Sequence, residues 1–133
     1  RILSSAASDV YKRQVILDPL NKITKKYSAL DKQTIHFTSE LKSNSPIENI
    51  DIVLNKLYQM NIQSLLVEGG AVTISHFIES NVFDEIHAYY APKLLGKGKS
   101  IFNGKKEISE LLNLTIVNTE IFDNDFKITY KRD

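Results

Sequence analysis

The stretch Ser64 to Ser80, SLLVEGGAVTISHFIES, decides the fold. It begins with Ser64 to Val67, an apolar run without polar alternation, which is typical of a strand covered on both faces. Gly69 and Gly70 interrupt this run. The apolar side chains that follow recur at the three- and four-residue intervals of one helix face, at Ile74, Phe77 and Ile78. The stretch therefore predicts a central strand, a glycine turn and a helix from about Ala71 to Ser80.

Three further elements are predicted on the N-terminal side of this stretch. Val15 to Leu17 is a short β-type run that should end at Asp18, because Pro19 lacks a backbone N–H. Thr34 to Thr38 is a second β-branched and aromatic run, and a polar, Lys-rich loop separates the two. Apolar residues at helical spacing predict a helix from about Ile47 to Met60.

Four elements are predicted on the C-terminal side. Glu85 to Ala91 is a β-type run that ends before a proline, and Glu107 to Leu112 suggests a short helix. Leu114 to Ile121 and Phe126 to Tyr130 alternate apolar and polar residues around a turn, as in an antiparallel hairpin. Together the elements indicate an α/β fold with a mixed, mainly parallel sheet, helices on both faces and a C-terminal antiparallel hairpin.

The composition is that of an ordinary globular domain. The chain has 133 residues, of which 42% are hydrophobic and 25% charged, so one domain is expected. Its net charge of +1 gives no reason to expect nucleic acid or a membrane surface as a partner. The lack of cysteine excludes disulfides, thiolate metal ligands and a cysteine nucleophile. We predict a cytoplasmic protein without a membrane span, acting on a small molecule.

The N-terminal end differs from the rest. The chain opens at Arg1 without a methionine, which indicates a fragment of a longer protein. Residues 1–14 show no clear period, and we predict a non-native or disordered leader there, set apart from residues 15–133. A genuine mobile N-terminal arm is the alternative.

The glycine turn falls where ligands of open α/β sheets bind, at the carboxyl end of the predicted strand. Gly69 and Gly70 would let a phosphate approach the backbone, and the N–H groups of Ala71 to Thr73 would meet it at the positive end of the helix dipole. This arrangement suits the pyrophosphate of a dinucleotide. The glycines do not form the Rossmann pattern, however, and paired glycines often serve only to turn the chain.

Glu68 closes the apolar run and has two interpretations. A carboxylate there must stay solvated, be paired or bind a donor. It accepts hydrogen bonds only, which suits the amino and ring N–H groups of a pyrimidine, but a solvated charge at a strand end is equally compatible with the sequence.

Other chemically capable side chains give weaker signals. The histidines are too scattered for a metal site, and we predict none; they are His36, His76 and His87. His76 is a candidate for the lining of a cofactor groove, whereas His36 and His87 fall within predicted strands. Five lysines around a second glycine loop could attract phosphate but fit a solvated basic loop better. They are Lys93, Lys97, Lys99, Lys105 and Lys106.

The run Leu65 to Gly98 resembles the reductase domain of bifunctional riboflavin-biosynthesis deaminase/reductase proteins. Those proteins carry a Val-Glu-Gly-Gly turn, a helix, a hydrophobic-Asp-Glu step and a Pro-Lys-Leu-Leu-Gly loop. The matching segments here are Val67 to Gly70, Val82 to Glu85 and Pro92 to Gly96. VILDP at Val15 to Pro19 also looks like a strand of the family, so the resemblance extends from Val15 to about Tyr130.

The resemblance implies a dihydrofolate-reductase-like fold and a homodimeric oxidoreductase. Its reaction would be the reduction, by NADPH, of the ribosyl group of 5-amino-6-(5-phosphoribosylamino)uracil to a ribityl chain. Glu68 would contact the aminopyrimidine substrate. A continuous run of residues would lie along NADPH: Gly70, Ala71, Val72, Thr73, Ile74, Ser75 and His76. The resemblance identifies no catalytic residue in this chain, and we assign none.

Two departures from the family pattern affect these expectations. Pro19 stands where the family usually has a serine that meets the cofactor. The family's domain also begins well upstream of Val15, so we expect residues 15–133 to be the C-terminal portion of one reductase domain, inactive alone. A zinc deaminase half would need cysteines, which this chain lacks. Two alternatives remain: a non-catalytic nucleotide-binding or oligomerisation remnant, and another dihydrofolate-reductase-like reductase of pteridines or pyrimidines.

Overall fold

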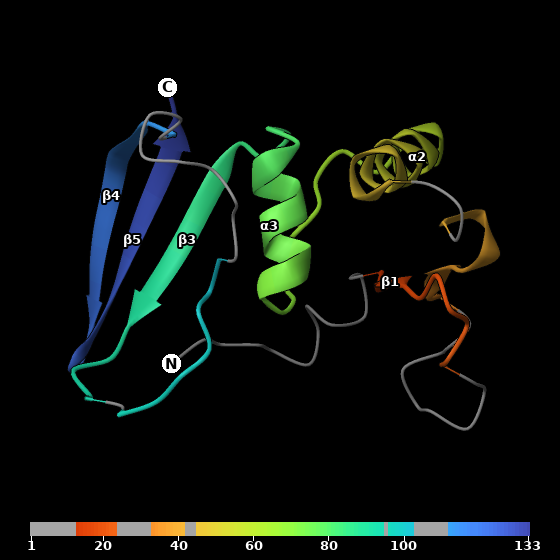
Figure 1. Cartoon of the computed structure of the whole chain (residues 1–133). Helices are drawn as coiled ribbons and strands as arrows, with labels where there is room; N and C mark the ends of the chain where they lie inside the picture. The colour runs from red at the N-terminus through yellow and green to blue at the C-terminus, as the bar shows by residue number, and fades with distance from the viewer. Residues whose placement is uncertain (1–12, 24–32, 42–44, 95, 103–111) are drawn as a thin grey trace. The chain divides into compact units, whose positions relative to one another are not determined.

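The structure, a computed structural model, shows a chain of mixed α/β character (Figure 1). The described residues are 13–23, 33–41, 45–94, 96–102 and 112–133. The chain divides into two compact units, Arg1–Ser64 and Leu65–Asp133, and each unit is described by itself.

The first unit contains a parallel pair of short strands. β1 (Val15–Leu17) pairs with β2 (Ile35–Phe37), with Val15 opposite Ile35 and Leu17 opposite Phe37. The backbone N–H of Asp18 donates to the carbonyl of Phe37 at 2.9 Å and so extends the pairing beyond β1. Both strands predicted in this region are confirmed, the second in a shorter form.

The long helix of the first unit, α2 (Pro46–Gln59), confirms the helix expected from Ile47 to Met60. Its start is fixed by a capping box, in which two side chains satisfy backbone N–H groups that have no partner within the helix. The Ser45 hydroxyl accepts from the Glu48 N–H at 3.3 Å, and the Glu48 carboxylate accepts from the Ser45 N–H at 2.7 Å. Pro46 occupies the first helical turn, where its missing N–H costs nothing.

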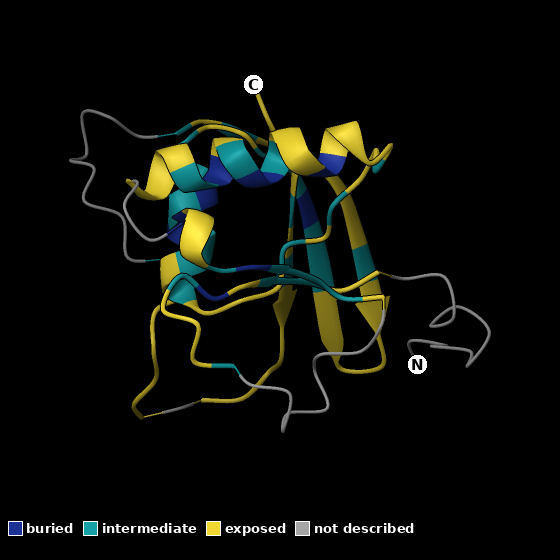
Figure 2. Cartoon of the chain, turned by 90° about the vertical axis from the view of Figure 1, so that its right-hand side faces the viewer, coloured by how far each residue is buried: buried dark blue, intermediate teal, exposed yellow. Residues whose placement is uncertain are grey.

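The buried apolar side of α2 forms much of the core of the first unit (Figure 2). A short 3₁₀ helix, η1 (Ser39–Leu41), follows β2 and contributes one buried leucine. The buried apolar side chains of this unit are Phe37, Leu41, Ile50, Val53 and Leu57. Those of α2 lie three and four residues apart, which is the spacing that predicted the helix.

The central strand predicted at Ser64 to Val67 is wrong. Residues 62–70 form neither helix nor strand, and Leu66 is 74% exposed instead of covered on both faces. A strand is held by hydrogen bonds to a neighbouring strand, and the described part of the chain places none beside this segment. The apolar run therefore has β-type composition without the pairing that would make it a strand.

The second unit contains a helix and an antiparallel sheet. The helix α3 (Ala71–Glu79) confirms the one expected from Ala71 to Ser80. The strands are β3 (Glu85–Tyr90), β4 (Leu114–Phe122) and β5 (Asp125–Arg132), in the order β3-β5-β4. The strand after α3 and the C-terminal hairpin are thus confirmed, and a β-bulge interrupts the hairpin between Ile116 and Asn118.

A single, mainly parallel sheet is not observed. The described strands form two sheets, and only the pairing of β1 with β2 is parallel. Without a paired strand at residues 64–67, nothing in the described residues joins the two sheets into one. The coarser prediction, an α/β fold with parallel and antiparallel strands, is confirmed; helices on both faces of a sheet stay a prediction.

Two remaining expectations have different outcomes. The short helix predicted at Glu107 to Leu112 lies almost entirely outside the described residues. Among the helices that the structure describes, none has the length and apolar character required to cross a membrane.

Candidate functional site

The glycine turn leads directly into α3. Gly70 is the N-cap residue, with φ −74° and ψ 170°, and its carbonyl accepts the first helical hydrogen bond, from Ile74 N–H at 3.2 Å. The N–H groups of Ala71, Val72 and Thr73 precede that bond and have no acceptor within the helix. No side chain caps this end, and its first turn carries no acidic residue. The start of α3 therefore presents backbone donors at the positive end of the helix dipole.

The two glycines have different surroundings. A Cβ at Gly69 would lie 3.1 Å from the Cβ of Thr73, so a side chain there would crowd Thr73, which would have to shift by a few tenths of an ångström. A Cβ at Gly70 would meet nothing within 4 Å. Gly70 therefore has open space on the side where a side chain would be, and a ligand can reach the backbone there.

The other predicted site residues differ in accessibility. Glu68 is exposed beside the turn, and Val72 in the first turn is 60% exposed. Ser75 is buried, and its hydroxyl donates to the Ala71 carbonyl at 2.6 Å. His76 is half-buried, and its carbonyl accepts from the Ser80 N–H at 3.0 Å near the end of the helix. The exposed part of the predicted site is thus Glu68, the glycines and Val72, whereas Ala71 and Thr73 in the same turn are half-buried.

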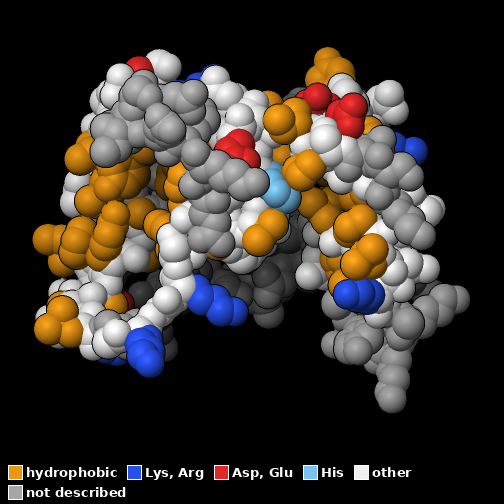
Figure 3. Space-filling model, in the orientation of Figure 1, with side chains coloured by type: hydrophobic (Ala, Val, Ile, Leu, Met, Phe, Trp, Pro, Cys, Tyr) orange, Lys and Arg blue, Asp and Glu red, His pale blue; other side chains and the backbone are white. Residues whose placement is uncertain are grey.

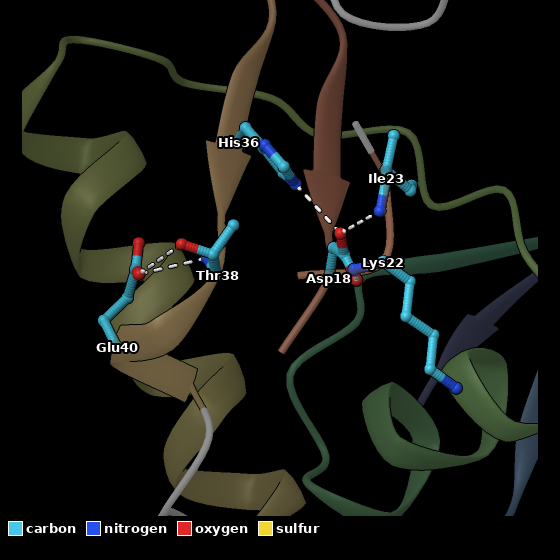
Figure 4. Close-up of polar contacts among 6 residues, drawn as sticks. All are labelled: Asp18, Lys22, Ile23, His36, Thr38 and Glu40. Atoms are coloured by element: carbon cyan, nitrogen blue, oxygen red, sulfur yellow. Dashed lines mark hydrogen bonds and ion pairs between the residues drawn. The ribbon is translucent and has the colours of Figure 1, made fainter. Parts of the chain in front are cut away.

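A second polar cluster lies in the first unit, at the carboxyl ends of β1 and β2 (Figure 4). The side chain of Asp18 is only 7% exposed. It accepts hydrogen bonds from the N–H groups of Lys22, at 2.9 Å, and Ile23, at 2.7 Å. His36 Nε2, from the neighbouring strand, lies 3.3 Å from the same carboxylate. Asp18 therefore connects two parts of this unit, which are the loop that follows β1 and the strand β2.

The electrostatics of this cluster favour ionised carboxylates. The hydrogen bond from Ile23 N–H, with smaller contributions from Lys22 and His36, lowers the pKa of Asp18 despite its burial. Hydrogen bonds from its own N–H and from that of Thr38 lower the pKa of Glu40. The Lys22 side chain points away from Asp18 (Figure 4), so the backbone and not the ammonium group supplies that contact.

The sequence did not predict the pairing of Asp18 with His36. The two residues are 18 positions apart, and only the parallel register of β1 and β2 brings them together. One local signal was available: an Asp followed by Pro at a strand end often binds backbone N–H groups a few residues on.

The remaining candidates do not converge on either cluster. Lys93, Lys97 and Lys99 are exposed, whereas Lys105 and Lys106 lie outside the described residues. His87 on β3 is 3.0 Å from the Glu85 carboxylate on the same strand.

Comparisons with known proteins identify the family. A family model described as the RibD C-terminal domain matches residues 5–128. The riboflavin biosynthesis protein RibD of Aquifex aeolicus is 36% identical over 85 residues, which cover 63% of this chain and 24% of that protein. The RibD of Bacillus amyloliquefaciens is 30% identical over 132 residues, which cover 96% of this chain and 31% of that protein.

Solved structures agree with this assignment. A Thermotoga maritima protein, described as a diaminohydroxyphosphoribosylaminopyrimidine deaminase/5-amino-6-(5-phosphoribosylamino)uracil reductase, superposes with a TM-score of 0.74 at 26% identity. The match covers 91% of this chain and 38% of that one. Acinetobacter baumannii RibD has the same fold, with a TM-score of 0.70 over 90% of this chain and 37% of that one, at 23% identity.

The fold and the comparisons define an α/β domain of the class found in riboflavin-biosynthesis proteins. The chain belongs to the RibD C-terminal domain family, and the resemblance inferred from its Val-Glu-Gly-Gly turn and flanking motifs is confirmed. The match begins at residue 5, ahead of Val15, where the resemblance was first seen. The chain spans about a quarter to a third of the length of the RibD proteins quoted above.

Proposed function

We propose that this chain supplies the C-terminal part of an NADPH-dependent reductase. The reaction is reduction of the ribosyl group of 5-amino-6-(5-phosphoribosylamino)uracil to a ribityl chain. Membership of the RibD C-terminal domain family supports a reductase of the riboflavin pathway. The observation that carries the proposal is the open Gly70 position, beside exposed Glu68, at the uncapped start of α3.

The start of α3 fits a dinucleotide phosphate. The N–H groups of Ala71, Val72 and Thr73 are free of helical acceptors, and no acidic side chain stands in that turn to repel an anion. Gly70 leaves the approach to these donors open. In this proposal Gly70 to His76 lies along the cofactor, and buried Ser75 supports the helix from inside.

The cofactor, when bound, supplies the hydride, and the role of the chain is to orient cofactor and substrate. Glu68 is proposed to accept hydrogen bonds from the amino and ring N–H groups of the pyrimidine. Its exposure beside the glycine turn leaves the carboxylate available to a ligand. The choice of NADPH over NADH follows the family resemblance.

Turnover tests the proposal. The chain, joined to the sequence that precedes it in its reading frame, should oxidise NADPH when the aminouracil substrate is added, followed by the loss of nicotinamide absorbance. Absence of turnover would overturn the proposal. NADPH binding by calorimetry without turnover would instead favour the non-catalytic nucleotide-binding alternative.

Glu68→Gln tests the substrate role. Gln keeps the shape but loses the charge and one acceptor, so KM for the substrate should rise about tenfold or more while KM for NADPH stays unchanged. Glu79→Gln, at the other end of α3, is the matched control and should change neither constant. Equal losses for substrate and cofactor in the Glu68 variant would contradict the assignment.

The same resemblance supports a homodimer in the cytoplasm, which we propose together with the reductase activity.

A further inference from the structure

The loop of residues 19–23 follows β1 and is held by the side chain and the carbonyl of Asp18. Two of its backbone N–H groups, those of Lys22 and Ile23, donate to the Asp18 carboxylate at 2.9 and 2.7 Å. The Asn21 N–H donates to the Asp18 carbonyl at 2.8 Å, and Asn21 adopts φ 49°, a conformation that asparagine tolerates. One residue thus binds three consecutive N–H groups, which gives the loop a defined conformation.

Asp18 is in turn fixed by β2. Its N–H donates to the Phe37 carbonyl at 2.9 Å, and His36 Nε2 lies 3.3 Å from its carboxylate. Only 7% of the Asp18 side chain is exposed, so a carboxylate that lost its donors would be left buried and unsatisfied at a cost in free energy. The loop is therefore attached firmly at the carboxyl ends of β1 and β2. Ligands of open α/β sheets bind at such an edge.

The loop offers a ligand its side chains more than its backbone. Asp18 already binds three of its N–H groups, and Pro19 has none. The exposed side chains are those of Leu20, Asn21 and Lys22, of which only the last is charged. The Lys22 side chain points away from Asp18 (Figure 4), and no carboxylate of the described residues forms an ion pair with it. Its ammonium group is therefore available to an anionic ligand.

An exposed lysine is not by itself a binding site. In the space-filling view several Lys and Arg side chains stand without an acidic side chain beside them (Figure 3), as is common on protein surfaces. Lys22 differs from a solvated lysine in two respects. Its own N–H is one of the donors to buried Asp18, so the carboxylate fixes the backbone from which the ammonium group extends. It also lies at the edge of the parallel strands where a ligand is expected.

We propose that Lys22 binds a phosphate group of a ligand and that Asp18 is the positioning residue that holds Lys22 in place. The inference rests on the proposed function, because both ligands of that reaction carry phosphate. NADPH has a pyrophosphate and a 2′-phosphate, and the pyrimidine has a phosphoribosyl group. A lysine ammonium is a compact point charge that suits phosphate from either source.

Substitutions of lysine in the longer protein test the phosphate role. Lys22→Gln removes the charge, so the dissociation constant of one phosphate-bearing ligand should rise about tenfold. Separate calorimetric titrations with NADPH and with the aminouracil substrate show which ligand Lys22 binds, and they do not depend on turnover. Lys22→Arg keeps the charge and should retain most of the affinity. Lys56→Gln, at an exposed position of α2 in the same unit, is the matched control and should change neither constant.

Asp18→Asn tests the positioning role. Asn replaces one carboxylate oxygen by an NH₂ group, which cannot accept from the N–H of Lys22 or Ile23. The substitution should raise the same dissociation constant that Lys22→Gln raises and leave the other one unchanged. Because both residues act through one contact, the variant that carries both changes should bind no more weakly than Lys22→Gln alone. A merely structural role of Asp18 would instead weaken both ligands and add to the loss from Lys22→Gln.

Unchanged dissociation constants in Lys22→Gln, or equal losses for both ligands, would overturn the phosphate role, and additive losses in the double variant would overturn the positioning role. Circular dichroism checks that the variants fold. Should Asp18→Asn unfold, Asp18→Glu, which keeps the charge but displaces the acceptor, takes its place with the same expected result. Normal turnover with unchanged constants in Lys22→Gln would refute this site and leave the proposed reductase standing. Binding that depends on Lys22 in a protein without turnover would do the reverse.

Discussion

The two adjacent glycines of the turn before α3 differ in what surrounds them. Gly69 is constrained by packing, because a Cβ there would lie 3.1 Å from the Cβ of Thr73. Gly70 has no steric constraint, and its φ of −74° suits any residue. A glycine that neither packing nor backbone conformation requires is better explained by what must approach it, which is the basis for placing a phosphate there.

Substitutions at the two glycines should therefore separate stability from binding. Gly70→Ser introduces a good N-cap, so the free energy of unfolding should rise by a few tenths of a kcal/mol. The new hydroxyl takes up an N–H that the phosphate needs, so the dissociation constant for NADPH in the longer protein should rise about tenfold. Gly69→Ala should lower stability by about 1 kcal/mol through crowding against Thr73. Urea denaturation measures the free energy of unfolding, and calorimetry measures the dissociation constant for NADPH. An unchanged NADPH affinity in Gly70→Ser would show that the phosphate does not bind at this turn.

At the level of elements, the sequence predicts those whose determinants are local. The hairpin follows from alternation around a turn in which Asp123 adopts φ 54°, a conformation that Asp tolerates. The two described α-helices, α2 and α3, follow from the spacing of their apolar residues. The segment at residues 64–67 was mispredicted because a strand also needs a partner, and composition carries no information about pairing.

The candidate sites also differ in whether the sequence could predict them, depending on whether their determinants are local. Glu68 and Gly70 could be singled out because their chemistry lies within one continuous turn at a helix start. Asp18 and His36 could not be paired, because their contact depends on the register of two separate strands.

The start of α2 offers a test of an element's local determinants. Ser45→Ala removes the hydroxyl that accepts from the Glu48 N–H, so the free energy of unfolding should fall by about 1 kcal/mol. Urea denaturation followed by circular dichroism should show a lower midpoint with an unchanged slope. Ser64→Ala, at an exposed serine outside the helices and strands, is the control. The same loss in both variants would mean that the cap contributes nothing specific.

At the scale of the whole molecule, carboxylates with lowered pKa link stability to pH. Hydrogen bonds lower the pKa of four such groups, which are Asp18, Glu40, Glu48 and Glu85. Near neutral pH these groups are ionised in both folded and unfolded chains, so their contribution is constant. As the pH falls below about 4, the unfolded chain binds protons before the folded one does. Stability is then lost progressively through the lower pKa values of the folded state.

Asp18 should account for a distinct share of this acid sensitivity. The backbone N–H groups that donate to its carboxylate should lower its pKa more than His36 does. Asp18→Asn removes the titrating group, so stability should change less steeply with pH below about 4 than in the wild type. His36→Phe removes the imidazole but leaves the N–H groups of Ile23 and Lys22 in place, at 2.7 and 2.9 Å from the carboxylate. Because the Ile23 hydrogen bond is the largest cause of the lowered pKa, most of the acid dependence should survive in that variant. Urea denaturation at a series of pH values from neutral to acid measures both slopes. A His36→Phe slope as shallow as that of Asp18→Asn would show that the imidazole, and not the loop backbone, holds the carboxylate ionised.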